Sequence, residues 1–120
     1  MALRGYYLGC PGWGLKSWIG RLFPAGPATP RGIASSELVA TVVARLAKAG
    51  LEPRRLDLTI VGARPKLAGH LDAMRAAIAT LLGIDPGAAN VKASTGNLGG
   101  DEGAGRTVSA NAVVVVGPAR

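Results

Sequence analysis

The stretch from Leu56 to Arg75 constrains the fold more than any other part of the sequence. Apolar and other side chains alternate from residue 56 to residue 61, which predicts a strand with Leu56, Leu58 and Ile60 on one face. A turn with glycine and proline follows at Gly62–Lys66. A three-and-four spacing then predicts a helix whose apolar stripe is Leu71, Met74, Ile78 and Leu81. A strand, a tight turn and a helix in direct succession are typical of an α/β fold.

The flanking sequence adds a helix before this unit and two strands after it. Ser35 or Ser36 is predicted to cap the earlier helix, and Gly50 to end it. Its apolar stripe consists of Leu38, Val39, Val42, Val43 and Leu46. Residues 52–53 should begin the link into the strand at Leu56. Residues 89–94 predict a short strand, and residues 95–105 predict a polar, glycine-rich loop. A last strand is expected over residues 107–116.

This order predicts a small α/β sandwich in a single domain spanning residues 1–120. Residues 1–30 are rich in proline and glycine and should form an irregular N-terminal segment. The continuous run Val113–Val116 is typical of a strand covered on both faces. Three strands make a narrow sheet, so the sequence favours either a missing strand or pairing across a subunit boundary.

Charge and composition narrow the class of partner. The net charge of +7 favours anionic partners, but the basic residues are scattered and lack interleaved aromatic side chains, so nucleic acid is an unlikely ligand. One cysteine excludes an intrachain disulfide, and with one histidine it excludes a Cys/His metal cluster within the chain. This composition indicates the cytoplasm. No run of about 18 apolar residues predicts a membrane span.

Two loops have the composition of a ligand site. In the turn from Gly62 onward, backbone groups can read the edge of a nucleobase and Arg64 or Lys66 can meet a phosphate. A plain strand-to-helix connection accounts for the same residues. The second loop runs from Lys92 to Asn97 and continues into the glycines that follow. It combines small hydroxyls with backbone amides that suit a diphosphate. Neither loop has the spacing of a P-loop or a dinucleotide-binding motif.

Candidates for acid–base chemistry are few. His70 is the only histidine, and its place at the start of the second helix favours a surface role over catalysis. Asp101 and Glu102 are adjacent, so in an extended stretch their carboxylates would point apart.

Three segments together resemble the 2-C-methyl-D-erythritol 2,4-cyclodiphosphate synthase family. They are LFPAGPATPRGIASSELV at 22–39, LDLTIVGARPKLAGHLDAMR at 56–75 and ANVKASTGNLG at 89–99. The resemblance extends from about Ile19 to Val116. It implies a small mixed sheet with the two main helices on one face. It also implies a homotrimer whose sheets pack around a three-fold axis, with active sites between subunits.

The resemblance also implies a function. The family enzyme is a phosphorus–oxygen lyase of isoprenoid precursor synthesis, in the methylerythritol phosphate pathway. It closes a cyclic diphosphate and releases CMP, and it uses zinc together with magnesium or manganese.

By position, the resemblance assigns three groups of site residues. The cytidine pocket would be formed by Gly62, Ala63, Arg64, Pro65, Lys66, Leu67 and Ala68. The diphosphate would lie against Ser94, Thr95, Gly96 and Asn97, with Thr95 as the catalytic candidate. The substrate loop would include Gly20, Phe23 and Pro24.

Several positions depart from the family pattern, and most of them concern metal ligands. The Asp-x-His pair of zinc ligands and a third histidine ligand lie, in the family, before the point where this chain begins. Asn97 stands where the family has a metal-binding glutamate, and Ala104 stands where it has an arginine. The neutral amide of Asn97 cannot replace a metal-binding carboxylate. We therefore expect a truncated or diverged member that has no cofactor or metal ligands of its own and is inactive alone.

Two alternatives accompany this expectation. The missing strand and histidine could be supplied by another chain, which would give a working enzyme. The chain could instead be a non-enzymatic trimer that serves as a structural or anion-binding module, as its charge of +7 suggests.

Overall fold

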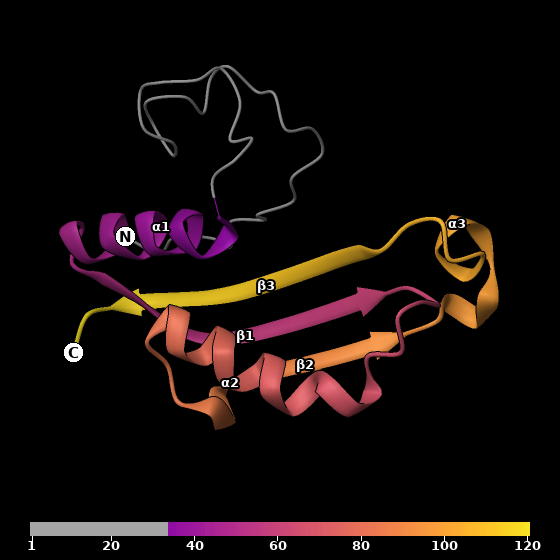
Figure 1. Ribbon diagram of the computed structural model, residues 1–120. Helices are drawn as coiled ribbons and strands as arrows, with labels where there is room; N and C mark the ends of the chain where they lie inside the picture. Colours follow the sequence, from indigo (N-terminus) through magenta and orange to yellow (C-terminus); the bar gives the residue numbers. More distant parts are fainter. Residues whose placement is uncertain (1–33) are drawn as a thin grey trace, which may run out of the picture.

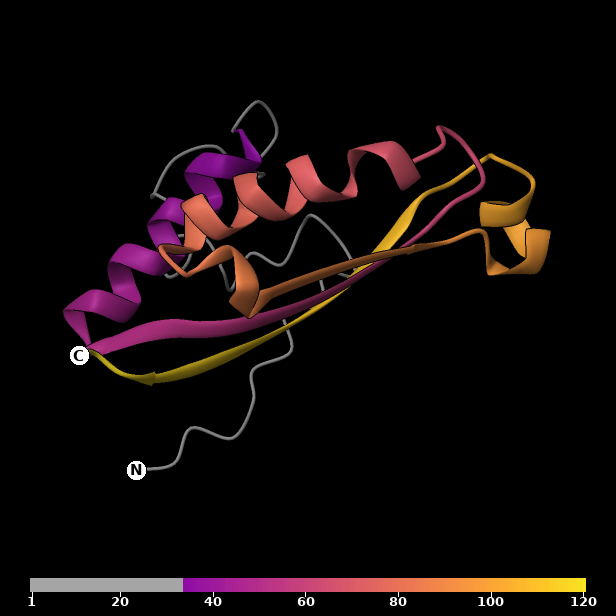
Figure 2. The same cartoon turned by 90° about the horizontal axis from the view of Figure 1, so that it is seen from below.

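The computed structural model describes residues 34–120, which form a mixed three-stranded sheet covered on one face by two helices. The elements are α1 (Ser35–Lys48), β1 (Leu51–Val61), α2 (Leu71–Leu82), β2 (Ala89–Ser94), α3 (Gly100–Gly103) and β3 (Ser109–Pro118). Short 3₁₀ turns lie at η2 (Ala68–His70), η3 (Pro86–Ala88) and η4 (Gly96–Leu98). Figure 2 shows α1 and α2 on the same side of the sheet, which confirms the predicted α/β arrangement.

Strand β1 is the central strand of this sheet. It pairs in parallel with β2 and antiparallel with β3, so the strand order is β2-β1-β3. The register places Leu56 opposite Ala89 on one side and opposite Val114 on the other. Consequently, β1 and β2 end at the same edge of the sheet, where Val61 lies beside Ser94.

The core lies between the sheet and the two helices. Its buried members are Leu56, Ala79 and Ala89, and Leu58, Ile78, Leu82, Ile84, Ala112 and Val114 pack against them. The predicted face of β1 is thus confirmed, since Leu56 and Ile60 are each only 6% exposed. The predicted apolar stripe of α2 was wrong at one position, because Leu81 is exposed. Ala79 takes the innermost position instead, because its small side chain lets α2 approach β2 closely.

Two element boundaries in the first half of the described chain differ from the sequence prediction. Strand β1 begins at Leu51, so residues 52–53 are part of the strand and not a link. A β-bulge between Pro53 and Arg55 explains this, because a bulge tolerates a residue that lacks an N–H donor. Helix α1 begins at Ser35 with Ala34 as its N-cap, so neither predicted serine caps it by a side-chain hydrogen bond.

The last part of the chain also differs from the prediction. Strand β3 starts and ends two residues later than expected, because Pro118 pairs with Leu51 at the start of β1. The region expected to be a plain loop contains η4 and α3. Within residues 34–120 of a single chain only the helix-facing side of β3 is covered, so cover on both faces stays a prediction. Val113 and Val115 are each 53% exposed there, on the face opposite the helices.

Candidate functional site

The two predicted ligand loops lie side by side at the carboxyl ends of the parallel strands. The turn after β1 and the loop after β2 are joined by a hydrogen bond of 2.9 Å from the backbone N–H of Gly62 to the carbonyl oxygen of Ser94. Both loops lie at the end of the sheet where Figure 1 labels α3. Open α/β sheets bind ligands outside the carboxyl ends of their strands, so this edge is the candidate site.

The turn at residues 62–68 offers its backbone to a ligand. The Arg64–Pro65 peptide bond is cis, and Arg64, Pro65 and Lys66 are exposed. Within residues 34–120, the backbone amides of Arg64, Lys66 and Leu67 donate no hydrogen bond. A Cβ at position 62 would lie 3.1 Å from Cγ2 of Val108, so the glycine lets the turn pack closely beside β3. The turn therefore has free backbone N–H groups and is held in place by the close contact of Gly62 with Val108.

The loop at residues 94–97 forms a concavity of backbone amides. Thr95 has right-handed helical backbone angles, and Gly96 and Asn97 are left-handed, with φ of +60° and +56°. Successive right- and left-handed residues form a nest, in which N–H groups converge on an anion. The hydroxyl of Ser94 accepts a hydrogen bond of 3.0 Å from the N–H of Gly96. The amides of Thr95 and Asn97 donate no hydrogen bond within the described residues.

A third segment, residues 99–106, packs against both loops. The predicted second loop continued into its glycines, but no residue of this segment was named as a site residue. The carbonyl oxygen of Glu102 accepts a hydrogen bond of 3.1 Å from the N–H of Ala63. Gly103 packs on the backbone of Leu98, and Gly105 packs on the guanidinium group of Arg64. The glycines at positions 99, 100, 103 and 105 were the available signal, because close backbone packing requires residues without a Cβ.

Among residues 34–120, Arg64, Lys66 and Glu102 have no ion-pair partner at this edge, so the sum of these unpaired charges is positive. Arg106 donates from Nε to the Asp101 carboxylate at 3.0 Å, and the Ser109 hydroxyl donates to the Glu102 carboxylate. The Ser109 hydrogen bond, aided by a backbone donor, lowers the pKa of Glu102. Arg64 and Lys66 form no ion pair within residues 34–120. The site therefore favours an anionic ligand.

The described residues do not fit a zinc or magnesium centre. Such metals need imidazole, thiolate or carboxylate donors in clusters. No three His, Cys, Asp or Glu side chains gather within residues 34–120. Asp101 and Glu102 are occupied by Arg106 and Ser109, and the side chain of Asn97 is a neutral amide. We therefore derive no chemical step through a metal.

The remaining predicted residues divide into two groups. Gly20, Phe23 and Pro24, with the expected irregular segment 1–30, lie outside the described residues. His70 ends η2 and is exposed, directly before α2. No helix within residues 34–120 is long and apolar enough to cross a bilayer.

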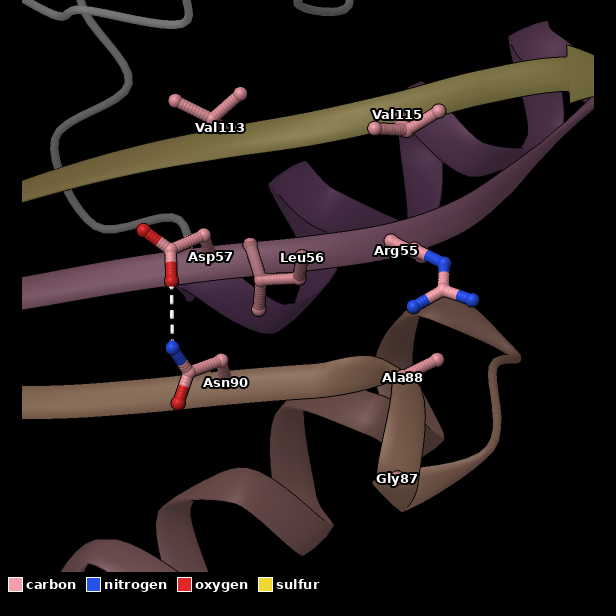
Figure 3. Close-up of a pocket in the computed structure, with 8 residues that line it drawn as sticks. All are labelled: Arg55, Leu56, Asp57, Gly87, Ala88, Asn90, Val113 and Val115. Atoms are coloured by element: carbon pink, nitrogen blue, oxygen red, sulfur yellow. Dashed lines mark hydrogen bonds between the residues drawn. The ribbon is translucent and has the colours of Figure 1, made fainter.

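A hollow of about 290 Å³, which the sequence did not indicate, lies on the sheet face opposite the helices (Figure 3). The Nδ2 atom of Asn90 donates to Asp57 at 2.7 Å, and the Lys92 ammonium lies 2.9 Å from the same carboxylate. Lys92, followed by Asn90, lowers the pKa of Asp57. Arg55, Val113 and Val115 border the hollow. This face thus combines exposed valines with a neutralised polar cluster.

The fold and the site define a class, namely small α/β proteins with a candidate anion site between loops at the carboxyl ends of parallel strands. The profile of the YgbB family matches residues 12–117, and the chain belongs to this family, which contains the cyclodiphosphate synthases of isoprenoid precursor synthesis. The predicted family resemblance is therefore confirmed.

Two named relatives illustrate this membership. The 2-C-methyl-D-erythritol 2,4-cyclodiphosphate synthase of Chromobacterium violaceum is 44% identical over 101 residues, which are 84% of this chain and 64% of that protein. The bifunctional enzyme IspD/IspF of Desulforudis audaxviator is 41% identical over 98 residues, which are 82% of this chain and 25% of that protein. The chain thus spans less than two thirds of the length of these relatives.

Solved structures confirm the fold. The IspF–CDP complex of Plasmodium falciparum matches with a TM-score of 0.68 at 20% identity, over 76% of this chain and 57% of that chain. A CDP-bound 2C-methyl-D-erythritol-2,4-cyclodiphosphate synthase matches with a TM-score of 0.65 at 26% identity, over 82% of this chain and 63% of that chain.

Proposed function

We propose that this protein is a cyclodiphosphate-synthase-like member of isoprenoid precursor synthesis that binds a cytidine nucleotide. The base would lie against residues 62–68, and the diphosphate against residues 94–97, with the Thr95 hydroxyl as the candidate catalytic group. The convergence of two loops with free backbone amides at one sheet edge carries this proposal. Two similar structures are complexes with CDP, which supports the choice of nucleotide.

The proposal separates binding from catalysis. Free amides and two unpaired cations suffice to hold a nucleotide, because charge-assisted hydrogen bonds to phosphate are strong. Cyclisation in the family uses metals, and the donors within residues 34–120 do not fit them. We propose that the chain alone binds the nucleotide without cyclising a substrate, that residues 1–120 form one domain, and that it works in the cytoplasm.

Isothermal calorimetry with CMP, CDP and UDP tests the nucleotide proposal. We expect CDP to bind in the micromolar range. UDP should bind about tenfold more weakly, because uracil offers an acceptor where cytosine donates from its amino group, and a backbone carbonyl is then left unpaired. No heat from CMP or CDP at millimolar concentration would overturn the proposal. Equal affinity for CDP and inorganic diphosphate would indicate the anion-binding module instead.

We also propose that the sheet face opposite the helices is buried in a homotrimer. This face exposes Val113 and Val115 beside the Asp57–Asn90–Lys92 cluster, and subunit contact would remove these valines from water. Light scattering should then give about 36 kDa, three times the chain mass of 12.1 kDa.

A lysine on this face should disrupt the assembly. We expect Val113→Lys to give mainly monomer at micromolar concentration, since three ammonium groups would meet near one axis without partners. Ala47→Lys on the exposed surface of α1 adds the same charge elsewhere and should leave the mass unchanged. A monomeric wild-type protein, or a Val113→Lys variant with an unchanged mass, would contradict the trimer.

A further inference from the structure

Arg64 lies where two of the three site loops meet. It belongs to the turn after β1, and its guanidinium group lies against Gly105 in the segment after α3. A Cβ built at Gly105 would lie 2.9 Å from the Nε atom of Arg64 and 3.4 Å from its Cζ atom. Gly105 also has φ of +73°, a conformation that suits glycine. The absence of a side chain at position 105 therefore makes room for the guanidinium group.

The guanidinium group has no partner among the described residues. The two carboxylates nearest in sequence to Gly105 are already engaged, Asp101 by Arg106 and Glu102 by Ser109. No ion pair or hydrogen bond of the Arg64 side chain occurs within residues 34–120. Arg64 thus keeps its full set of donors for a ligand.

The loops around Arg64 are held by contacts between main-chain atoms. The N–H of Ala63 bonds to Glu102, and Gly103 lies against the backbone of Leu98, directly after the nest at residues 94–97. The segment at residues 99–106 therefore links the turn that carries Arg64 to the loop that carries the nest. A planar guanidinium group matches a terminal phosphate with two parallel N–H···O bonds.

We propose that Arg64 binds the terminal phosphate of a nucleoside diphosphate and thereby determines the preference for a diphosphate over a monophosphate. This inference rests on the proposed nucleotide site. The nearby carboxylates are engaged and Asn97 is neutral, so no free carboxylate is left here to hold a divalent cation. The guanidinium group supplies the positive charge that such a cation would otherwise bring. CDP therefore binds without a divalent cation.

Calorimetry on the full chain tests this proposal with CDP, CMP and inorganic diphosphate, each in EDTA and in magnesium. We expect Arg64→Ala to weaken CDP binding by about 10- to 100-fold and CMP binding by less than about 3-fold. Arg64→Lys should restore part of the loss, since it keeps the charge without the paired donors. EDTA should leave the wild-type affinity for CDP unchanged.

Arg75→Ala is the matched control. Arg75 lies on α2, and its one ion pair within residues 34–120 is an exposed pair with Asp72. This variant therefore removes the same charge away from the loops and should bind CDP as the wild type does. An Arg64→Ala variant that keeps the CDP-over-CMP preference, or CDP binding that requires magnesium, would overturn the role of Arg64. If cytidine nucleotides fail to bind but diphosphate binds in an Arg64-dependent way, only the nucleotide proposal fails. If the wild type binds none of CDP, CMP and inorganic diphosphate, the nucleotide proposal and the role of Arg64 are both rejected.

Discussion

Replacing Gly103 with alanine is expected to abolish nucleotide binding. The new Cβ would lie 2.0 Å from the carbonyl carbon of Leu98 and 2.3 Å from its oxygen, and both are main-chain atoms that cannot rotate away. Leu98 already has φ of +59°, so the segment after the nest has little freedom to adjust. The nest at Thr95–Asn97 must therefore shift. We expect CDP affinity to fall at least about 100-fold and the free energy of unfolding to fall by about 1–3 kcal/mol.

Gly99→Ala provides the control within the same loop. Its Cβ would meet only the carbonyl oxygen of Gly96, at an ordinary contact distance of 3.5 Å, and its φ of −87° suits any residue. This variant should bind CDP within about threefold of the wild type, as expected for a substitution without a clash. Calorimetry and urea denaturation measure both effects. Equal behaviour of the two alanine variants would mean that Gly103 does not hold the nest in place.

Leu56→Ala is expected to have the largest effect on stability. Leu56 is only 6% exposed and belongs to the buried cluster with Ala79 and Ala89, which offer little volume to fill a cavity. Truncation of a buried leucine costs about 2–5 kcal/mol. Domains of this size have about 5–15 kcal/mol in total, so the variant should retain only a fraction of its stability. Urea denaturation followed by circular dichroism would measure the loss.

Leu81→Ala is the control, because it removes the same atoms from a leucine that is partly exposed. Leu81 lies near the end of α2 and is 38% exposed, so Leu81→Ala should cost about 1 kcal/mol or less. Similar losses for the two variants would show that the cluster around Leu56 is not the stabilising core.

Local patterns in the sequence predicted most of the fold. The alternation from Leu56 to Ile60 identified the buried face of β1, and the glycines at positions 50 and 83 marked the ends of both main helices. The early start of β1 was missed because Pro53 is a poor strand residue and is accepted only through the bulge that follows it. The shift of β3 was missed because its ends are set by pairing with Leu51, far away in the sequence.

The site was predictable only where it is local. The turn after Gly62 and the loop after Ser94 stood out by composition and by resemblance, and β1 and β2 bring them together. Their roles in binding remain predictions. No residue of the segment at 99–106 was named as a site residue, because its contacts join residues far apart in the chain, as between Ala63 and Glu102. No short-range pattern encodes such a contact.

The parallel pair of β1 and β2 has a consequence for how this chain can change over evolutionary time. Leu56 and Ala89 anchor the core at the beginning of the pairing, whereas Val61 and Ser94 hold the ligand loops where the pairing ends. Selection on folding and selection on chemistry therefore act on different ends of the same two strands. A position such as Asn97 can depart from the family pattern without touching the core cluster. A lineage can thus lose or rebuild its chemistry while it inherits an intact fold.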